Sequence, residues 1–392
     1  MPKLSYSKLV ASLLAGVAVA QTPGATPEVH PLLPTWKCTN SGGCVQQNTS
    51  VVLDFEYREI RATSGGGTCK TGSNTSGWKL NKAQCPDAAT CAKNCVVEPA
   101  DYPGMGITTS GNALTLQHYV RKNGQLYNAT PRVYLLGADG KYVMMSVLNG
   151  EVSVDVDLSQ VPCGENAAFY LSEMVADGTK NPNQFNVGGA GMGNGYCDAQ
   201  CQGYCCNEMD IIEANSMANV FTGHPCKGNN CDKGGCGYNP YGSGQRGFYG
   251  PGKTLDTNKP FTAVTQFQAS GGRMTSFTRK YIQNGRTINS GSVNNCGSEG
   301  GTGGMSGMGD ALKRGSKSSP PGERSFLLTK PVVLAMSIWN DAAQNMAWLD
   351  QGVNGPCPAG QGTPGNIQSQ KPDTRVVFSN IRWGDIGSTT KG

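Results

Sequence analysis

The 392-residue sequence has little charge and little histidine. Charged residues make up 15% of the chain, against about 25% in an average soluble protein. The formal net charge of +5 is not gathered into a cluster of Lys and Arg, so we expect no nucleic-acid partner. His30, His118 and His224 are far apart and form no pair with metal-ligand spacing. We therefore expect no metal site.

Long hydrophobic runs are also scarce. The run at residues 9–20 follows Lys3 and Lys8 and ends in Ala18-Val19-Ala20, which is the pattern of a secretory signal peptide. About 12 apolar residues are too few to span a bilayer, so we expect no membrane partner. Residues 1–20 are predicted to be the signal peptide, and the mature protein is predicted to be secreted and extracellular.

Two motifs typical of other enzyme classes are missing or out of context. The sequence contains no Gly-X-Ser-X-Gly elbow, which argues against a serine hydrolase. Residues 242–247 match the glycine pattern of a dinucleotide-binding loop, but no strand–helix–strand unit surrounds them. We therefore expect no cofactor.

Glycine and cysteine are plentiful instead. The 55 glycines follow no strict Gly-X-Y period, which excludes collagen. All 16 cysteines follow the predicted cleavage site, and an even number in an exported chain indicates up to eight disulfides. Four closely spaced cysteines could instead bind zinc, although secretion favours disulfides: Cys197, Cys201, Cys205 and Cys206. Three potential glycosylation sequons begin at Asn48, Asn74 and Asn128.

Alternation of apolar and polar residues is the dominant local pattern. Residues 152–158 read Val-Ser-Val-Asp-Val-Asp-Leu, which is typical of a strand with one buried face. Asn-Gly steps at Asn123, Asn149 and Asn284 offer the positive φ values that tight hairpin turns need. Similar apolar runs occupy residues 50–57, 113–120, 132–136, 168–171, 261–267, 331–339 and 374–383. The pattern predicts an all-β protein built as one large antiparallel sandwich.

Three acids fall within six residues of an apolar segment: Glu208, Asp210 and Glu213. Glu208 and Asp210 share one face of a strand, but Glu213 would point the other way on a regular strand. A β-bulge at Ile211 or Ile212 would return Glu213 to the same face. The two Glu carboxyl groups would then be roughly 5 to 6 Å apart, which is typical of retaining rather than inverting glycosidases.

Crowding of the three acids is expected to make their pKa values differ. Three carboxylates on one face repel when all are ionised, so at least one should keep its proton to higher pH, as a general acid requires. Three acids in six residues also form solvated surfaces in many proteins. Spacing alone therefore leaves catalysis as a hypothesis.

The segment at residues 207–215, Asn-Glu-Met-Asp-Ile-Ile-Glu-Ala-Asn, resembles the signature of glycoside hydrolase family 7, the secreted fungal cellulases. The similarity extends over essentially the whole mature chain. It implies a jelly-roll β-sandwich of two large curved sheets, with long disulfide-pinned loops and an open cleft for β-1,4-glucan on the concave face. Residues 21–392 would form a single, monomeric catalytic domain without a carbohydrate-binding module. Other matching stretches are residues 85–95, 108–111, 195–201, 249–252 and 339–350.

The resemblance also implies a role for each acid. Glu208 would be the nucleophile, Glu213 the general acid/base, and Asp210 the partner that orients and tunes Glu208. Trp339 and Trp348 would be sugar platforms on opposite sides of the scissile bond, because an aromatic face suits the C–H face of glucose. Other residues implied to line the substrate cleft are Tyr170, Asp198, Gln200, His224, Asn166, Arg132 and Tyr57.

Loop lengths favour an endoglucanase within this family. The segments from Cys201 to Cys205 and from Cys226 to Cys231 are short where tunnel-forming cellobiohydrolases carry longer loops. Glu59 stands where processive members place a Trp, and Gly242 and Asn354 stand where they place product-site arginines. The resemblance therefore implies an endo-β-1,4-glucanase. A cellobiohydrolase and a non-catalytic jelly-roll lectin are the alternatives.

The resemblance pairs every cysteine. Two of the bridges would tie the strand before Glu208 to the loop at residues 197–201. Reduction is therefore predicted to loosen this strand before it unfolds the sandwich. The implied pairs are Cys38 with Cys44, Cys69 with Cys95, Cys85 with Cys91, Cys163 with Cys357, Cys197 with Cys206, Cys201 with Cys205, Cys226 with Cys231, and Cys236 with Cys296.

Overall fold

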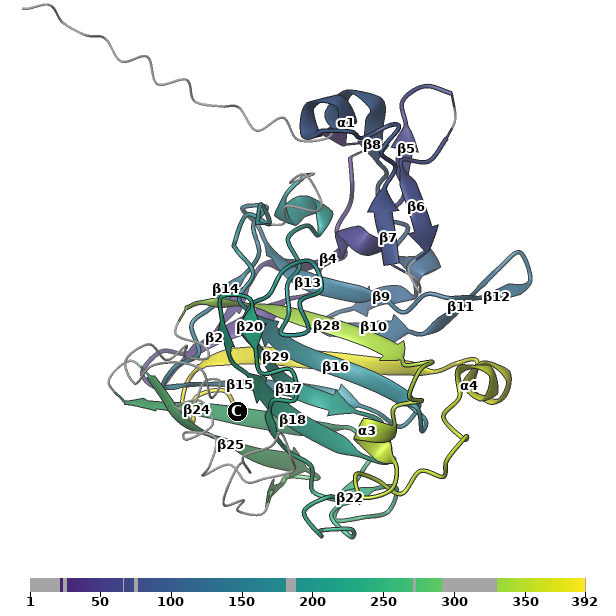
Figure 1. Ribbon diagram of the computed structural model, residues 1–392. Coiled ribbons are helices and arrows are strands. Elements are labelled where there is room, and N and C mark those ends of the chain that lie inside the picture. The colour runs from purple at the N-terminus through teal and green to yellow at the C-terminus, as the bar shows by residue number, and fades with distance from the viewer. Residues whose placement is uncertain are drawn as a thin grey trace, which may run out of the picture.

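The computed structural model describes residues 22–23, 27–65, 67–73, 77–180, 188–270, 273–290 and 330–391. Two large, mainly antiparallel β-sheets stack face to face (Figure 1). We name them the site sheet and the backing sheet. The predicted all-β sandwich is confirmed.

The site sheet has eight strands and carries the acidic segment. Its strands follow the order β21 (Cys236–Tyr238), β18 (Asn219–His224), β17 (Glu208–Ala214), β16 (Glu165–Ser172), β28 (Val332–Asn340), β13 (Arg132–Gly137) and β4 (Thr49–Leu53). The short strand β14 (Met144–Met145) pairs with β28 outside this path. The acidic segment therefore lies in the interior of the sheet, between β16 and β18.

The backing sheet has nine strands. Its order is β26 (Arg286–Asn289), β25 (Arg273–Gln283), β24 (Phe261–Ser270), β15 (Gly150–Asp157), β29 (Arg375–Asp385), β10 (Ala113–Gln117) and β9 (Ile107–Ser110). Two further strands lie outside this path: β2 (Thr35–Thr39) pairs in parallel with β29, and β3 (Gly43–Gln47) pairs with β2. The last strand in the chain is thus in the middle of the sheet.

The core lies between the two sheets. It joins apolar side chains of both, such as Phe169 and Ile338 from the site sheet with Val154 and Phe378 from the backing sheet. The rings of Phe169 and Phe378 have centroids 5.4 Å apart. Burial of each such side chain contributes about 1.5–3 kcal/mol to the stability of the fold, so these side chains stabilise the stacking of the two sheets.

The predicted strands form, but one predicted run is cut short and another is divided into two strands. The run at residues 50–57 ends as a strand at Leu53, because the Asp54 side chain accepts a hydrogen bond from the Glu56 N–H and starts the 3₁₀ helix η1 (Phe55–Tyr57). The run at residues 113–120 divides at His118 into β10 and β11 (Tyr119–Lys122). Both differences arise from local hydrogen bonding and turning that apolar periodicity does not encode.

The three Asn-Gly steps all have positive φ, but only two make hairpins. Asn123, with φ 49°, turns β11 into β12 (Gln125–Asn128), and Asn284, with φ 52°, turns β25 into β26. Asn149, with φ 54°, instead precedes β15 on the path from the site sheet to the backing sheet. Its prediction as a hairpin turn is wrong, because β14 and β15 belong to different sheets.

Short elements surround the sandwich. Among the described residues the helices are α1 (Ala88–Asn94), α3 (Ala347–Asp350) and α4 (Pro364–Gln370), with 3₁₀ turns η2 (Pro103–Met105) and η4 (Ala190–Met192) besides η1. In the small sheets, β8 (Cys95–Val97) lies between β1 (Thr22–Pro23) and β5 (Ile60–Ala62) and pairs with both. The other pairs are β6 (Lys70–Ser73) with β7 (Gly77–Leu80), β19 (Cys226–Lys227) with β20 (Asn230–Cys231), and β22 (Tyr249–Gly250) with β23 (Leu255–Asp256). Within the described ranges, no helix is long and apolar enough to cross a membrane.

Seven of the eight implied disulfides are confirmed. They join Cys38 to Cys44, Cys69 to Cys95, Cys85 to Cys91, Cys163 to Cys357, Cys197 to Cys206, Cys201 to Cys205, and Cys226 to Cys231. The four sulfurs of the zinc alternative are all used in these bridges, so that alternative is wrong. The pair of Cys236 with Cys296, the signal peptide at residues 1–20, and Asn74 lie outside the described residues.

Candidate active site

The three acids of β17 share one face because the strand contains a bulge. The pairing with β16 skips Ile211, and the register with β18 also shifts between Asp210 and Glu213. One extra residue restores the parity, so Glu213 joins Glu208 on the face away from the core. The apolar residues of β17 pack into the core: Met209, Ile211, Ile212 and Ala214. The bulge predicted at Ile211 or Ile212 is confirmed.

Glu208 lies at the start of β17 and is only 7% exposed. Its Oε2 accepts a hydrogen bond from the backbone N–H of Ala199 at 3.0 Å. Burial raises the pKa of Glu208 well above its usual value, and the charges of Asp210 and Asp198 add to this shift. The charge of His224 and the Ala199 N–H act in the opposite direction. These two groups are therefore the ones that favour an ionised Glu208.

Glu213 is partly buried near the other end of β17. The amide of Asn166 on β16 donates a 2.9 Å hydrogen bond to its Oε1. The amide oxygen of Asn166 accepts from the Ala214 N–H at 3.1 Å, which fixes the orientation of the amide. Burial, helped by the charge of Asp210, raises the pKa of Glu213 to about 8, while His224 and Asn166 oppose the shift. Glu213 thus holds a proton at neutral pH, as predicted for one acid of the group.

Asp210 is paired with His224 from β18. The Oδ2 of Asp210 lies 3.1 Å from Nε2 of His224, and Nδ1 of the same ring donates to the Asp232 carbonyl at 2.8 Å. Burial alone would lower the pKa of His224, but the hydrogen bond to Asp210 and the charges of Asp210 and Glu208 raise it to about 10. Both ring nitrogens face oxygen acceptors, so the geometry suits an imidazolium ion.

Gly235 closes the site behind His224. Its φ of +65° is a left-handed conformation that favours glycine, and a Cβ there would lie 2.4 Å from Cε1 of the His224 ring. The position therefore admits no side chain while His224 stays in place. Its importance had no signal in the sequence, where it is one glycine among many.

Tyr170 and Asp198 lie beside the acids as expected. Tyr170 pairs with Asp210 across β16 and β17, and its hydroxyl hydrogen-bonds to the Tyr196 hydroxyl at 2.9 Å. Asp198 is 4% exposed and accepts from the Gln202 N–H at 2.8 Å. Sequence reasoning did not select Tyr196, although it belongs to the matching stretch at residues 195–201.

The Arg132 side chain is held by two carboxylates and an aromatic ring. Its guanidinium donates to Asp54 at 2.9 Å and to Glu56 at 3.2 Å, and lies 3.4 Å from the ring centroid of Tyr196. The ring of Tyr57 is 6.0 Å away. A substrate hydroxyl would have to compete with two carboxylates for the N–H groups of Arg132. We therefore place Arg132 in the wall behind Tyr196 and Tyr170.

Gln200 is the predicted site residue that is least connected to the acids. Its side chain is exposed, and its amide donates to the Lys233 carbonyl at 2.9 Å. The neighbouring residue Ala199 provides the backbone contact to Glu208 instead. Almost every residue type has a backbone N–H, so the sequence does not indicate which one contacts Glu208.

Trp339 and Trp348 meet at the Glu213 end of the site. Trp339 pairs with Asn166 across β28 and β16, and Trp348 lies on α3. Their ring centroids are 6.4 Å apart with an interplanar angle of 30°. Carbon contacts of about 3.5–4.0 Å on each face would require more than 7 Å for a sugar ring between them. A sugar ring therefore does not fit between the two indole rings.

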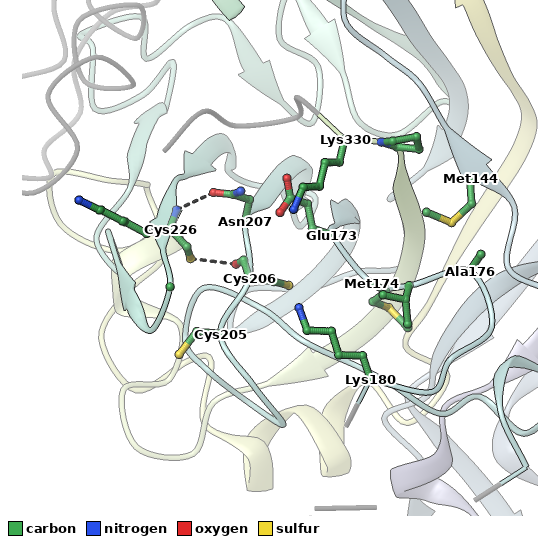
Figure 2. Close-up of a pocket in the computed structure, with 14 residues that line it drawn as sticks. Met144, Glu173, Met174, Ala176, Lys180, Cys205, Cys206, Asn207, Cys226 and Lys330 are labelled. Carbon is green, nitrogen blue, oxygen red and sulfur yellow. Dashed lines mark hydrogen bonds between the residues drawn. The ribbon is translucent and has the colours of Figure 1, made fainter. Parts of the chain in front are cut away.

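A cavity of about 740 Å³ adjoins the site without containing the β17 acids (Figure 2). Asn207, the residue before Glu208, forms part of its wall and accepts a 2.6 Å hydrogen bond from the Cys226 N–H. Glu173 faces the cavity together with Lys180 and Lys330. Burial raises the pKa of Glu173, while Asn207 and both lysines oppose the shift. None of the predicted site residues lines this cavity.

The chain matches a known protein family over most of its length. A family model described as glycosyl hydrolase family 7 matches residues 23–204 and 202–390. The chain belongs to glycosyl hydrolase family 7. The two matched parts overlap at residues 202–204, inside the segment that the sequence analysis found to be short, between Cys201 and Cys205.

The family 7 relatives include endoglucanases and cellobiohydrolases. The chain is 48% identical over 402 residues to endoglucanase EG-1 of Hypocrea jecorina, covering 96% of this chain and 82% of that protein. The native structure of the Humicola insolens endocellulase EGI matches with TM-score 0.79 and 39% identity, over 94% of this chain and 100% of that one. A family 7 cellobiohydrolase from Daphnia pulex matches with TM-score 0.80 and 31% identity at the same coverage. The shared fold thus does not separate the two classes, whereas the sequence lies nearer these endoglucanases.

Proposed function

We propose that this family 7 glycoside hydrolase is an endo-β-1,4-glucanase that cleaves internal bonds of a β-1,4-glucan with retention of configuration. The observation that carries the proposal is the bulge in β17, which puts Glu208 and Glu213 on one face. Their surroundings differ in a way that suits a nucleophile and an acid. Burial raises the pKa of both carboxyl groups, but a backbone N–H from Ala199 favours an ionised Glu208, while Glu213 accepts a hydrogen bond from the Asn166 amide.

In the first step, a carboxylate oxygen of Glu208 attacks the anomeric carbon. The glycosidic C–O bond breaks, and the leaving oxygen takes the proton of Glu213. This produces a glycosyl ester on Glu208 and an ionised Glu213. In the second step, Glu213 removes a proton from water, the water oxygen attacks the anomeric carbon, and Glu208 leaves as a carboxylate. Two inversions give net retention.

Asp210 and His224 support the charge changes of this cycle. Asp210 lies between the two glutamates in sequence and shares their face, so its negative charge favours the protonated form of each. The His224 imidazolium limits this effect. The pair thus lets one glutamate ionise while the other keeps its proton.

Short loops support the endo assignment. The disulfide between Cys201 and Cys205 closes a segment of five residues, and that between Cys226 and Cys231 closes the small β19–β20 hairpin. Long roofing loops would be needed at such positions to form a tunnel. The 48% identity to an endoglucanase points in the same direction.

The proposal also covers the domain organisation, the secretion and the substrate contacts of the enzyme. We propose that residues 21–392 form a single, monomeric, secreted catalytic domain whose partner is the glucan chain. Tyr170, Asp198, His224, Asn166, Trp339 and Trp348 would contact or shape the bound sugar, with Arg132, Tyr57 and Gln200 farther from the reacting bond. Two of the three sequon asparagines, Asn48 and Asn128, are exposed and accessible to glycosylation.

The test compares viscosity loss with reducing-end release on soluble carboxymethylcellulose, for wild type and Glu208→Gln. An endo-acting enzyme lowers viscosity steeply while few reducing ends appear, and the variant should lose at least about 10⁴-fold in rate. Slow viscosity loss with accumulation of cellobiose from unsubstituted glucan would favour the cellobiohydrolase alternative. Binding of glucan by wild type without hydrolysis would favour the lectin.

A further inference from the structure

Arg279 is a buried cation in the core, on the side of β17 opposite the acids. It belongs to β25 of the backing sheet and is only 4% exposed. Its guanidinium lies 4.5 Å from the ring centroid of Phe221 and 5.6 Å from that of Tyr281. Arg279 makes no salt bridge within the part of the chain that the structure describes.

The hydrogen bonds of Arg279 run from one sheet to the other. Nε donates to Oγ1 of Thr265, which is its direct cross-strand partner on β24, at 2.9 Å. Nη2 donates to the backbone carbonyl of Ile211 in β17. The hydrogen bond to Thr265 thus fixes the plane of the guanidinium, so that its Nη2 group points at the bulge.

Ile211 is the residue that needs such a donor. It is left out of the register with both neighbouring strands, β16 and β18. The extra residue of a bulge is unpaired in the ladder, and a buried carbonyl without a donor is unfavourable. Ile211 is fully buried, so water cannot supply that donor. Arg279 therefore supplies a buried donor to the carbonyl of the residue that the register leaves out.

Packing alone does not explain a cation at this position. A buried charge without a counter-ion is costly, and apolar residues of similar volume often replace buried charged groups without loss of stability. The aromatic faces of Phe221 and Tyr281 offset only part of the dehydration. An apolar side chain could not reproduce the hydrogen bonds to Thr265 and to the bulge, and of these two the second reaches the site sheet.

We propose that Arg279 is a positioning residue for catalysis, which holds the bulge of β17 from the core side and thereby fixes Glu213 relative to Glu208. Arg279 touches neither substrate nor acid and acts through the backbone of Ile211. The inference rests on the proposed roles of the two glutamates. Loss of the contact should misplace the proton donor more than it disturbs the fold.

The experiment measures how kcat/KM, which reports the first, glycosylating step, depends on the leaving group in wild type, Arg279→Met, Arg279→Lys and Glu213→Gln. One substrate is 2,4-dinitrophenyl cellobioside, whose leaving group needs no proton, and the other is an unsubstituted cello-oligosaccharide, whose leaving group does. Arg279→Met should lose about tenfold to hundredfold on the oligosaccharide and less than about threefold on the activated substrate. Arg279→Lys, which keeps a donor but not the fork, should fall between Arg279→Met and wild type.

Arg58→Met is the matched control. Arg58 is also a buried arginine, but its guanidinium binds Glu28. This variant should be less stable and lose similar fractions of activity on both substrates. Equal losses on both substrates in Arg279→Met, or losses that follow thermal stability as in the control, would overturn the proposal. If Arg279→Met does not fold, the same comparison is made with Arg279→Lys.

Glu213→Gln separates failure of this inference from failure of the proposed function. If Glu213→Gln is selectively impaired on the oligosaccharide and Arg279→Met is not, Glu213 is the acid and only the role of Arg279 is refuted. If Glu213→Gln is equally impaired on both substrates, the assignment of Glu213 fails, and the inference fails with it.

Discussion

The two ends of β17 are secured in different ways. Before Glu208, disulfides hold the chain: Cys206 is bonded to Cys197, and Cys201 to Cys205. After Glu213, amide side chains do so: Asn166 accepts from Ala214, and Asn215 donates to Asp350 at 2.8 Å. The end with the proposed nucleophile, Glu208, thus depends on covalent bonds. The end with the proposed acid, Glu213, depends on hydrogen bonds that a single substitution can remove.

The bulge joins these two ends, so its removal should have the largest effect. Deletion of Ile211 would place Glu213 four residues after Glu208, so a regular strand would keep both on one face but without the local bend and twist of the bulge. We expect glucan hydrolysis to fall by about 10²-fold, because a displacement of about 1 Å at the proton donor is enough for a loss of this size. Steady-state kinetics and circular dichroism would measure activity and folding.

A matched control is available in the backing sheet. The register of β29 with β15 also shifts, and Asn380 in that irregular stretch has φ 50°. Deletion of Asn380 should lower stability but leave the activity of the folded fraction within a few-fold of wild type. Comparable inactivation by both deletions would show that the geometry of the β17 bulge is not what matters.

At the acid end, Asn166→Ala tests how the hydrogen bond tunes Glu213. The amide favours the ionised carboxylate, so its loss should raise the pKa of Glu213 further above about 8. Activity requires protonated Glu213 and falls as pH rises through this pKa, so the alkaline limb of the kcat/KM profile should move to higher pH.

The rate of Asn166→Ala at its optimum should fall about tenfold, because the acid is less well oriented. Asn366→Ala, which changes an exposed amide on α4, serves as the control. An alkaline limb that stays in place or moves to lower pH would contradict the assignment.

At the nucleophile end, the smallest effect is expected from removing a disulfide. The double variant Cys197→Ser, Cys206→Ser should lose a few-fold in kcat, because Ala199 and its N–H are less firmly held against Glu208. Reduction should likewise impair activity before it unfolds the sandwich. Activity and thermal unfolding would be followed together.

The control for this prediction is Cys38→Ser, Cys44→Ser, which opens a loop of similar length in β2 and β3. Each double variant should lose about 2–3 kcal/mol of stability, since loops of six to nine residues differ little in closure entropy. Full activity after removal of the bridge between Cys197 and Cys206 would refute the covalent support of Glu208.

Sequence reasoning found the parts of the site that depend on residue type and parity. The alternation of β17 predicted that only a bulge at Ile211 or Ile212 could bring Glu213 beside Glu208, and the pairing confirms it. The family resemblance supplied the disulfide pairs and the neighbouring polar residues. Both depend on information that the linear order of residues carries.

The remaining features depend on how distant segments meet. The N–H of Ala199 reaches Glu208 only because the loop before β17 folds back on the strand. Gln200 turns to Lys233, and Asn149 leads from one sheet to the other, for the same kind of reason. Periodicity describes each strand alone, so it could not predict contacts that arise when strands and loops are assembled.

The place of β29 has a consequence for the order of folding. This strand lies between β15 and β10 in the backing sheet, yet it is the last strand in the chain. During synthesis the sheet therefore exists as two halves until residues 375–385 emerge, while every strand of the site sheet has already been made. Contacts of such long sequence separation form slowly and leave apolar strand edges exposed. A premature stop before residue 375 would thus leave a gap through the centre of the backing sheet.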